Sequence, residues 1–264
     1  MCGRYASARK RQDLLEEFRI DRDRVTDDLE PDYNVAPTKP VYAVLTRGQR
    51  GDGAAGPGGE GAGSGPGSGQ EVARELRVVR WGLVPFWAKD PSIGSRMINA
   101  RVETVDAKPA FRRAFAKRRC LLPADGFYEW LKVEDQGKTR KQPYYIHRTD
   151  GGVLAFAGLY ELWRDKSVPD DHPQAWLWTA VIITTSAEDE VGRLHDRMPM
   201  VIDPARWGDW LDPDSSDAAH VHALLAPAAA SGLASYPVGT DVNYVRNNGP
   251  RLIEPLAGDP APHA

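Results

Sequence analysis

The chain has little cysteine, no long apolar run and little excess charge. Two cysteines in 264 residues cannot form a disulfide framework, and they make no CxxC or Cys/His cluster with zinc spacing. No stretch of about 18 apolar residues is present, so we expect no membrane span. The basic N-terminal segment lacks the apolar core of a secretory signal. We therefore expect a soluble cytoplasmic protein, and we also expect a monomer that needs neither a metal nor a cofactor.

The net charge of −3 excludes a uniformly basic DNA-coating protein, but the charge is unevenly distributed. Between Arg96 and Arg119 there are eight Arg and Lys residues and only two acidic ones, whereas acidic residues gather between Asp203 and Asp217. Such asymmetry indicates a basic face suited to a polyanion. For the segment 112–119, an ordinary solvated helix face is the alternative.

Glycine is concentrated in one segment, residues 48–70, which contains eleven glycines and no aliphatic side chain larger than Ala. Such a segment buries too little surface to offset the entropy of ordering, so we predict a disordered loop. Residues 41–46 and 76–81 on either side alternate apolar and polar positions, as strands do. We therefore place this loop inside one domain, between two strands of a hairpin.

Strands predominate in the rest of the chain. They are expected at residues 119–122, 127–131, 144–147, 153–157, 177–184 and 200–203. Helices are expected at residues 7–18, with Ser7 as N-cap, and at 104–117, 187–194 and 217–225. This pattern predicts an α+β fold: a single domain over residues 1–245, with a mainly antiparallel, barrel-like β-sheet core and a few flanking helices. Residues 246–264 are expected to be a partly disordered tail, frayed from Ala257.

Cysteine is the second residue, and removal of Met1 would leave its amine and thiol on one residue. Such an aminothiol condenses with an aldehyde to an imine, and the thiol then closes a five-membered thiazolidine. An α-amine titrates near pH ~8 and a thiol near ~8.5, so both nucleophilic forms exist at neutral pH. Cys120 lies in an apolar pattern and is expected to be an inert buried thiol.

Several segments downstream differ from ordinary core sequence. They are YNVAPT (33–38), RWGLVPFW (80–87), INARVET (98–104), DGFYEW (125–130) and LHDRMPM (194–200). Glu129 alternates with Tyr128 and Trp130, so it faces the other side of its strand. Taken singly, each polar residue also has a structural explanation: Glu129 as an ion-pair partner, His195 as a structural histidine, and Asn99 as a turn cap.

Taken in order, these segments, together with MCGRY at the start and CLLPADGFYEW in the middle, resemble the SOS response-associated peptidase (SRAP) family, also described as abasic-site processing proteins. The resemblance runs from Cys2 to about Val242 and omits the glycine-rich loop. It implies a protein of the DNA-damage (SOS) response that binds single-stranded DNA and crosslinks covalently to abasic sites. It would lie on the nucleoid when bound to DNA.

The resemblance also assigns roles. Cys2 is implied as the nucleophile, Asn99 as the residue that holds the opened sugar, and Glu129 and His195 as acid–base groups. The residues expected to contact DNA are Arg4, Asn34, Trp81, Trp87, Arg101 and Arg197. The activity would be lyase-type crosslinking, with a peptidase activity limited to exposing Cys2.

Two other functions stay open from the residues alone. In the first, Cys2 is the thiolate of an N-terminal-nucleophile hydrolase or cysteine peptidase. In the second, the protein binds single-stranded DNA without covalent chemistry and Cys2 is incidental. The basic and aromatic segments favour DNA as the partner, and the position of Cys2 favours covalent chemistry.

Overall fold

A computed structural model describes residues 2–48, 72–135, 137–172, 174–187, 189–215, 217–225 and 232–256. Its strands are β1 (Tyr5–Ser7), β2 (Arg22–Asp23), β3 (Asp32–Val35), β4 (Pro40–Gly48), β5 (Val72–Trp81), β6 (Asn99–Arg101), β7 (Arg119–Ala124), β8 (Gly126–Asp135), β9 (Lys138–Arg148), β10 (Leu154–Arg164), β11 (Trp176–Ser186), β12 (Arg197–Pro199) and β13 (Leu233–Pro237). Its α-helices are α1 (Arg11–Glu17), α2 (Arg112–Lys117), α3 (Asp189–Gly192), α4 (Trp207–Leu211) and α5 (Ala218–Leu224). Short 3-10 helices are η1 (Pro91–Arg96), η2 (Val102–Thr104), η3 (Pro204–Arg206), η4 (Thr240–Asn243) and η5 (Pro250–Ile253).

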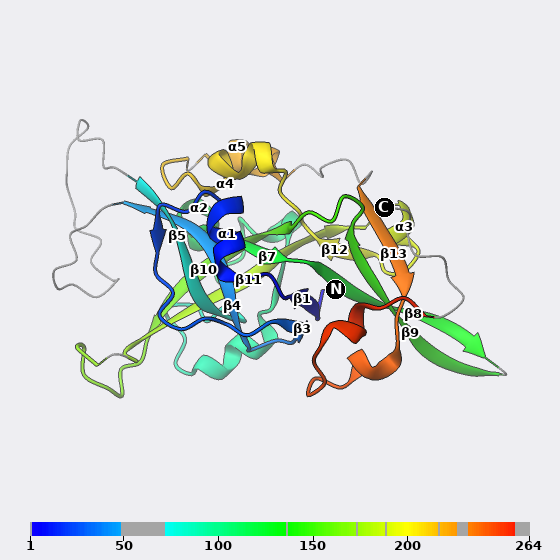
Figure 1. The fold of residues 1–264 in the computed structure, drawn as a ribbon. Helices are drawn as coiled ribbons and strands as arrows, with labels where there is room; N and C mark the ends of the chain where they lie inside the picture. The colour runs from blue at the N-terminus through cyan, green and yellow to red at the C-terminus, as the bar shows by residue number, and fades with distance from the viewer. Residues whose placement is uncertain are drawn as a thin grey trace.

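Five strands close into a barrel at the centre of the molecule (Figure 1). The strands β5, β4, β7, β10 and β11 are neighbours in that order, and each pair is antiparallel. Parallel pairing of β11 with β5, Thr179 opposite Arg80, closes the ring. The prediction of a single α+β domain with a barrel-like, mainly antiparallel core is confirmed.

The pairing of β4 with β5 runs without interruption from Pro40 opposite Arg80 to Gly48 opposite Val72. The glycine-rich segment therefore joins two adjacent antiparallel strands, as predicted. Disorder was predicted for residues 48–70; Gly48 instead ends β4, and the rest of that segment lies outside the described residues, so its disorder stays a prediction.

Strand β10 shows how the barrel separates two cores. All of its residues from Leu154 to Trp163 are buried, so both of its faces are covered. Because side chains alternate along a strand, Phe156 and Tyr160 face one cluster, and Ala157 and Leu159 face another. The cluster of Phe156 also holds Cys2, Tyr5 and Trp81, whereas the opposite cluster includes residues of α1, α2, α4 and α5.

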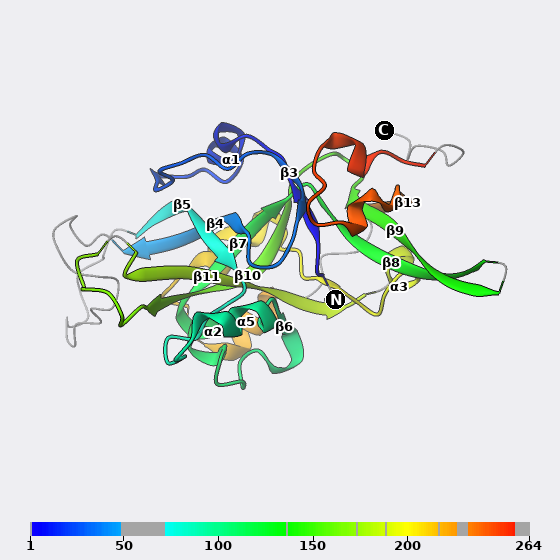
Figure 2. The same cartoon turned by 90° about the horizontal axis from the view of Figure 1, so that it is seen from below.

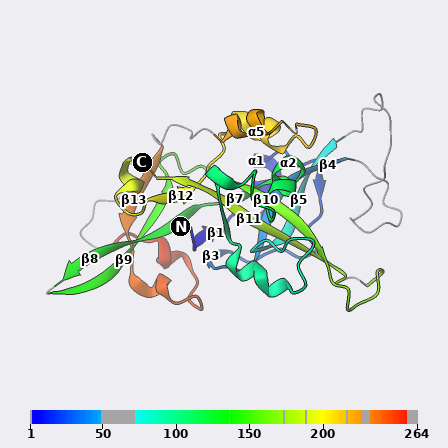
Figure 3. The same ribbon diagram turned by 180° about the vertical axis from the view of Figure 1, so that it is seen from behind.

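A second sheet, in the order β13-β9-β8-β1-β3, joins the N-terminus to the barrel. Short β1 lies between β3 and β8, with Tyr5 opposite both Val35 and Phe127. After β13 the chain passes through η4 and η5. In Figures 1, 2 and 3 this orange-to-red segment lies beside the N-terminus, and an Arg4 side-chain hydrogen bond to the Val242 carbonyl (2.8 Å) joins the two.

Among the predicted elements, one begins with a strand, one is shortened and one is shifted along the chain. Ser7 ends β1 instead of capping a helix, since β1 pairs with β3, and α1 begins only at Arg11. The helix predicted over 104–117 is shortened to α2, because Pro109 lacks an N–H and restricts the residue before it. The strand predicted over 200–203 lies three residues earlier, as β12.

The boundary expected after residue 245 does not coincide with a break in the structure. Leu252 is buried, and the backbone N–H of Leu256 donates to the Pro237 carbonyl at 3.0 Å. Residues 246–256 therefore belong to the folded domain, and residues 257–264 lie outside the described residues. None of the described helices is long and apolar enough to cross a membrane.

Candidate active site

Cys2 and Asn99 are joined by a hydrogen bond. The Asn99 side-chain Nδ2 donates to the Cys2 carbonyl at 2.7 Å, and Cys2 is fully buried. The Asn99 Oδ1 atom is buried and has no hydrogen-bond partner among the described residues. Since a buried amide oxygen ordinarily accepts a hydrogen bond, Asn99 has an acceptor available for a ligand beside Cys2.

The position of Asn99 is set by β6, which pairs in parallel with β11, Asn99 opposite Ile182. Trp81 supports the residue before it, because its indole Nε1 donates to the Ile98 carbonyl at 2.9 Å. The Trp81 ring also packs edge-on against Tyr5, with ring centroids 5.2 Å apart. One buried indole thus links β6 to the N-terminal strand.

Glu129 lies on β8 and is 3% exposed. The backbone N–H of Tyr128 donates to the Arg4 carbonyl at 3.0 Å, which places Glu129 level with the first residues of the chain. Burial raises the pKa of the Glu129 carboxyl to about 7, and the positive charge of the amino terminus opposes this rise. At neutral pH the carboxyl therefore exists in both forms, as a general acid–base group requires.

His195 lies in the connection between α3 and β12. The backbone N–H of Arg197 donates to its Nδ1 at 2.9 Å, and the Asp196 Oδ1 lies 2.7 Å from the same nitrogen. Burial and the charge of the amino terminus lower the pKa of His195, and Asp196 opposes them. The Arg197 N–H and the Asp196 carboxylate thus both face Nδ1 of the His195 ring. The amino terminus thus acts electrostatically on both Glu129 and His195.

The Cys2 thiol is not poised as a thiolate. Burial raises its pKa well above the ordinary range, and the negative charge of Glu129 raises it further. Its Sγ has a long contact of 3.9 Å with the Arg4 carbonyl. Cys120 is also buried in the barrel, and burial raises the pKa of its thiol too.

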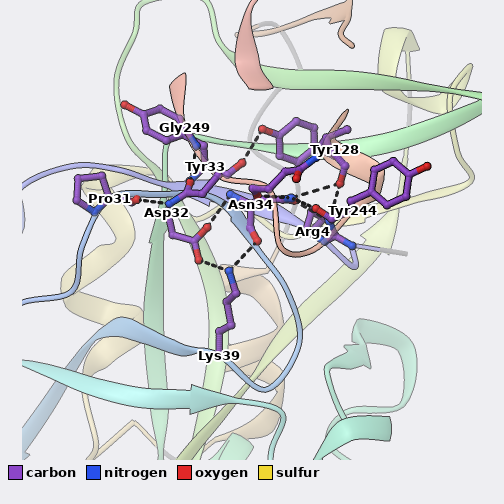
Figure 4. Close-up of polar contacts among 12 residues, drawn as sticks. Arg4, Pro31, Asp32, Tyr33, Asn34, Lys39, Tyr128, Tyr244 and Gly249 are labelled. Atoms are coloured by element: carbon purple, nitrogen blue, oxygen red, sulfur yellow. Dashed lines mark hydrogen bonds and ion pairs between the residues drawn. The ribbon is translucent and has the colours of Figure 1, made fainter. Parts of the chain in front are cut away.

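Arg4 and Asn34 hold the segment that follows β13. Arg4 donates from Nη1 to the Asn34 Oδ1 at 2.6 Å and to the Val242 carbonyl at 2.8 Å (Figure 4). Asn34 is fully buried, and its Nδ2 donates to the Tyr244 and Asn247 carbonyls at 3.0 and 2.9 Å. We expected Asn34 to contact DNA, but its buried side-chain amide is hydrogen-bonded within the protein and is not exposed to a ligand.

The two arginines near the site differ in their surroundings. Arg101 is exposed at the end of β6. Arg197 forms a bidentate ion pair with Glu103, at 2.5 and 3.0 Å, and also donates to the Thr184 carbonyl at 2.6 Å. Arg101 is thus available to a polyanion, whereas Arg197 ties β12 to the segment after β6.

The two tryptophans expected to stack on bases also differ. Trp81 is fully buried, and this placement does not match a stacking role; in β5 it shares the inward face with Val79. Trp87 is 51% exposed, next to Phe86 at 49%. The Arg113 guanidinium lies 4.9 Å from the centre of the Phe86 ring. Phe86 was not among the predicted residues, although the motif shared with Trp87 contains it.

Sequence reasoning also missed the residues after Val242. Trp130 Nε1 donates to the Asn243 Oδ1 at 2.7 Å, so this segment touches the neighbour of Glu129. No local pattern signals such a contact across 113 positions. Among the described residues, no group of three or more His, Cys, Asp or Glu is arranged to hold a metal ion.

Comparisons with known proteins show what this chain is similar to. The model of the family described as SOS response associated peptidase (SRAP) matches residues 1–245. The chain is 35% identical over 254 residues to the abasic site processing protein YoqW of Bacillus subtilis (strain 168), covering 96% of this chain and 99% of that protein. It is 29% identical over 260 residues to the abasic site processing protein YedK of Escherichia coli (strain K12), covering 97% and 100%. A crystal structure of a Bacteroides thetaiotaomicron protein has the same fold, with a TM-score of 0.72 at 24% identity over 96% of this chain and 99% of that one.

Proposed function

Since this chain belongs to the SOS response-associated peptidase family, we propose that it processes abasic sites by forming a covalent crosslink with single-stranded DNA through Cys2. The observation that carries the proposal is the contact of Cys2 with Asn99 beside a buried carboxyl. The Asn99 amide holds the Cys2 carbonyl at 2.7 Å, and the pKa of Glu129 is raised to about 7. Such a site orients an amine and exchanges protons near neutral pH.

The reaction begins after Met1 is removed. The Cys2 amine attacks the C1′ aldehyde of the opened deoxyribose, and the resulting carbinolamine loses water to give an iminium ion. The Cys2 thiol then adds to C1′ and releases its proton, closing a thiazolidine. Amine, aldehyde and thiol are consumed and one water is released, so no oxidant or reductant is needed.

The supporting residues have separate tasks in this scheme. Glu129 accepts the proton of the attacking amine, because its carboxyl is partly ionised at neutral pH. The protonated His195 ring donates a proton to the leaving hydroxyl and becomes neutral, and its lowered pKa makes the imidazolium a readier proton donor. Asn99 orients Cys2 and offers its Oδ1 to a sugar hydroxyl.

The order of steps follows from the Cys2 thiol. The thiol closes the ring by adding to the carbon of the iminium ion, so the imine forms before the ring, and burial, which raises the pKa of the thiol, favours the amine as the first nucleophile. The same shift disfavours the cysteine peptidase alternative, in which a thiolate must attack an amide first.

DNA binding is assigned to exposed groups at the end of β6 and in the loop after β5. We propose that Arg101 contacts a phosphate and that Trp87, with Phe86, stacks on unpaired bases, since all three side chains are exposed. Arg4 also lies at the site, but its Nη1 is bonded within the protein. Single strands are favoured because an abasic sugar can turn outward without breaking base pairs.

The test is intact mass spectrometry of the protein alone and after mixing with an abasic single-stranded oligonucleotide. We expect a chain without Met1 and an adduct heavier by the oligonucleotide minus one water. Cys2→Ala keeps the amine, so it should form only an imine that borohydride traps, with more strand cleavage by β-elimination. Cys120→Ala is the matched control and should crosslink like the native protein. A stable adduct with Cys2→Ala, or its loss with Cys120→Ala, would contradict the proposal.

A further inference from the structure

A turn next to the candidate active site displays large apolar side chains in solvent. Tyr244 is 59% exposed and Val245 is 47% exposed. The backbone there is fixed: the Asn247 N–H donates to the Tyr244 carbonyl at 2.9 Å, and the Asn247 Nδ2 donates to the Asp241 carbonyl at 2.9 Å. Two adjacent exposed apolar side chains, one of them aromatic, on an ordered turn form a candidate binding surface.

A buried side chain anchors this turn from behind. Asn34, fully buried, donates from Nδ2 to the carbonyls of Val242, Tyr244 and Asn247 at 3.3, 3.0 and 2.9 Å (Figure 4). Because the contacts are all to backbone carbonyls, they fix the path of the turn and leave its side chains directed to solvent. Tyr244 is therefore presented on a preformed support, which lowers the entropy lost on binding.

The turn is bonded to neighbours of two site residues. Arg4, two positions after Cys2, donates to the Val242 carbonyl at 2.8 Å. Trp130, which follows Glu129, donates to the Asn243 side chain at 2.7 Å. Seen from below in Figure 2, the N-terminus lies between β6 and this orange-to-red segment. A strand whose abasic sugar occupies the site can extend to this turn.

The side chains of the turn match the chemistry of single-stranded DNA. The Arg246 guanidinium lies 5.7 Å from the centre of the Tyr244 ring and is exposed. An aromatic ring stacks on a base, and an adjacent guanidinium binds phosphate. We propose that Tyr244 stacks on a base flanking the abasic nucleotide and that Arg246 binds the adjoining phosphate. This inference rests on the proposed function, since it places the DNA at Cys2.

The test separates stacking from crosslinking. An oligonucleotide with a tetrahydrofuran abasic analogue has no aldehyde and cannot form the imine, so it reports binding alone. A 2-aminopurine placed on either side of the analogue loses fluorescence when it stacks on an aromatic ring. The variants are Tyr244→Ala, Tyr244→Phe and Arg246→Gln. Arg251→Gln, an exposed arginine of the nearby helix η5, is the matched control.

For Tyr244→Ala we expect an affinity about tenfold lower and loss of quenching at one of the two flanking positions. Tyr244→Phe should bind and quench like the native protein, since it keeps the ring. Arg246→Gln should reduce the slope of log affinity against log salt by about 0.7, as expected for one phosphate contact on a single strand, and Arg251→Gln should not.

The outcomes distinguish the two proposals. If the native protein quenches 2-aminopurine through Tyr244 but forms no adduct with a true abasic strand, the proposed crosslinking fails and the stacking surface stands. If the native protein crosslinks while Tyr244→Ala keeps full affinity and full quenching at both positions, the stacking surface is refuted. Circular dichroism of each variant checks that the exposed substitutions leave the fold intact.

Discussion

The carboxyl of Glu129 provides the sharpest physical test, because its burial predicts a pH dependence of stability. Glu129 is 3% exposed, and burial raises its pKa from 4.5 to about 7. A folded state that holds the proton more tightly than the unfolded chain is stabilised at low pH. This contribution is fully present below about pH 4.5 and is lost as the pH rises through about 7.

The size of the effect follows from proton linkage. For these two pKa values, the free energy of unfolding contributed by Glu129 should fall by about 2.5 kcal/mol between pH 5 and pH 8. Glu129→Gln keeps the size and the hydrogen-bonding groups of the side chain but cannot ionise. The variant should therefore gain about 2.5 kcal/mol relative to the native protein over the same interval.

Urea denaturation of both proteins at half-unit steps from pH 5 to pH 8 measures this difference. The control is Glu134→Gln, which replaces an exposed glutamate of the same strand. Its free energy of unfolding should depend on pH in the same way as that of the native protein. The difference in free energy of unfolding between the native protein and Glu129→Gln should change with pH. If it stays constant within about 0.5 kcal/mol, the pKa of the Glu129 carboxyl is not raised and the argument from burial is refuted. The crosslinking rate of Glu129→Gln should also lose its dependence on pH near 7.

Three further predictions concern Asn99, Arg119 and the glycine-rich loop. Asn99→Ala should slow crosslinking about tenfold or more while leaving affinity for single-stranded DNA within a few-fold, because it removes the bond that orients Cys2; equal rates in a timed gel assay would refute this. Arg119→Met should lower the free energy of unfolding in urea by about 3 kcal/mol or more, because the buried guanidinium donates to five backbone carbonyls; a loss below 1 kcal/mol would contradict it. Replacing residues 49–71 with a short glycine turn should keep the crosslinking rate and leave stability equal or higher, by about 0.6 kcal/mol per halving of loop length; a tenfold slower rate at unchanged urea midpoint would show that the segment handles DNA.

Local sequence patterns predicted most of the strands but not which strands pair with one another. The alternation of β4 and β5 identified the hairpin, and the apolar runs identified β7, β10 and β11. Closure of the barrel depends on the parallel contact of Thr179 with Arg80, which no local pattern encodes. Helices were less well predicted, since α1 and α2 are short and packing decides where they start.

The different burial of the two tryptophans could be predicted from the sequence. Trp81 is in phase with Val79 on a strand, so alternation places both on one face, and the structure buries that face. Trp87 follows Pro85 in a loop, where no such constraint applies, and it is exposed. Glu129 had no such signal: its strand neighbour Tyr128 is buried as well, so the two faces of β8 cannot be told apart by hydrophobicity.

Asn34 explains why a motif can belong to a site without touching its ligand. A buried amide is costly unless it is hydrogen-bonded, and that of Asn34 bonds to Arg4 and to carbonyls 208 to 213 positions away. Its partners are backbone groups, so the sequence of the distant segment carries no matching signal. Replacing Asn34 would release the turn of Tyr244 and one contact of Arg4 together, so its effect on DNA binding would arise from lost support. The polar residues of this site therefore divide by burial. Under the proposed function, residues with solvent-accessible groups, such as Arg101, contact DNA, and residues enclosed by backbone groups, such as Asn34, position the segments that contact it.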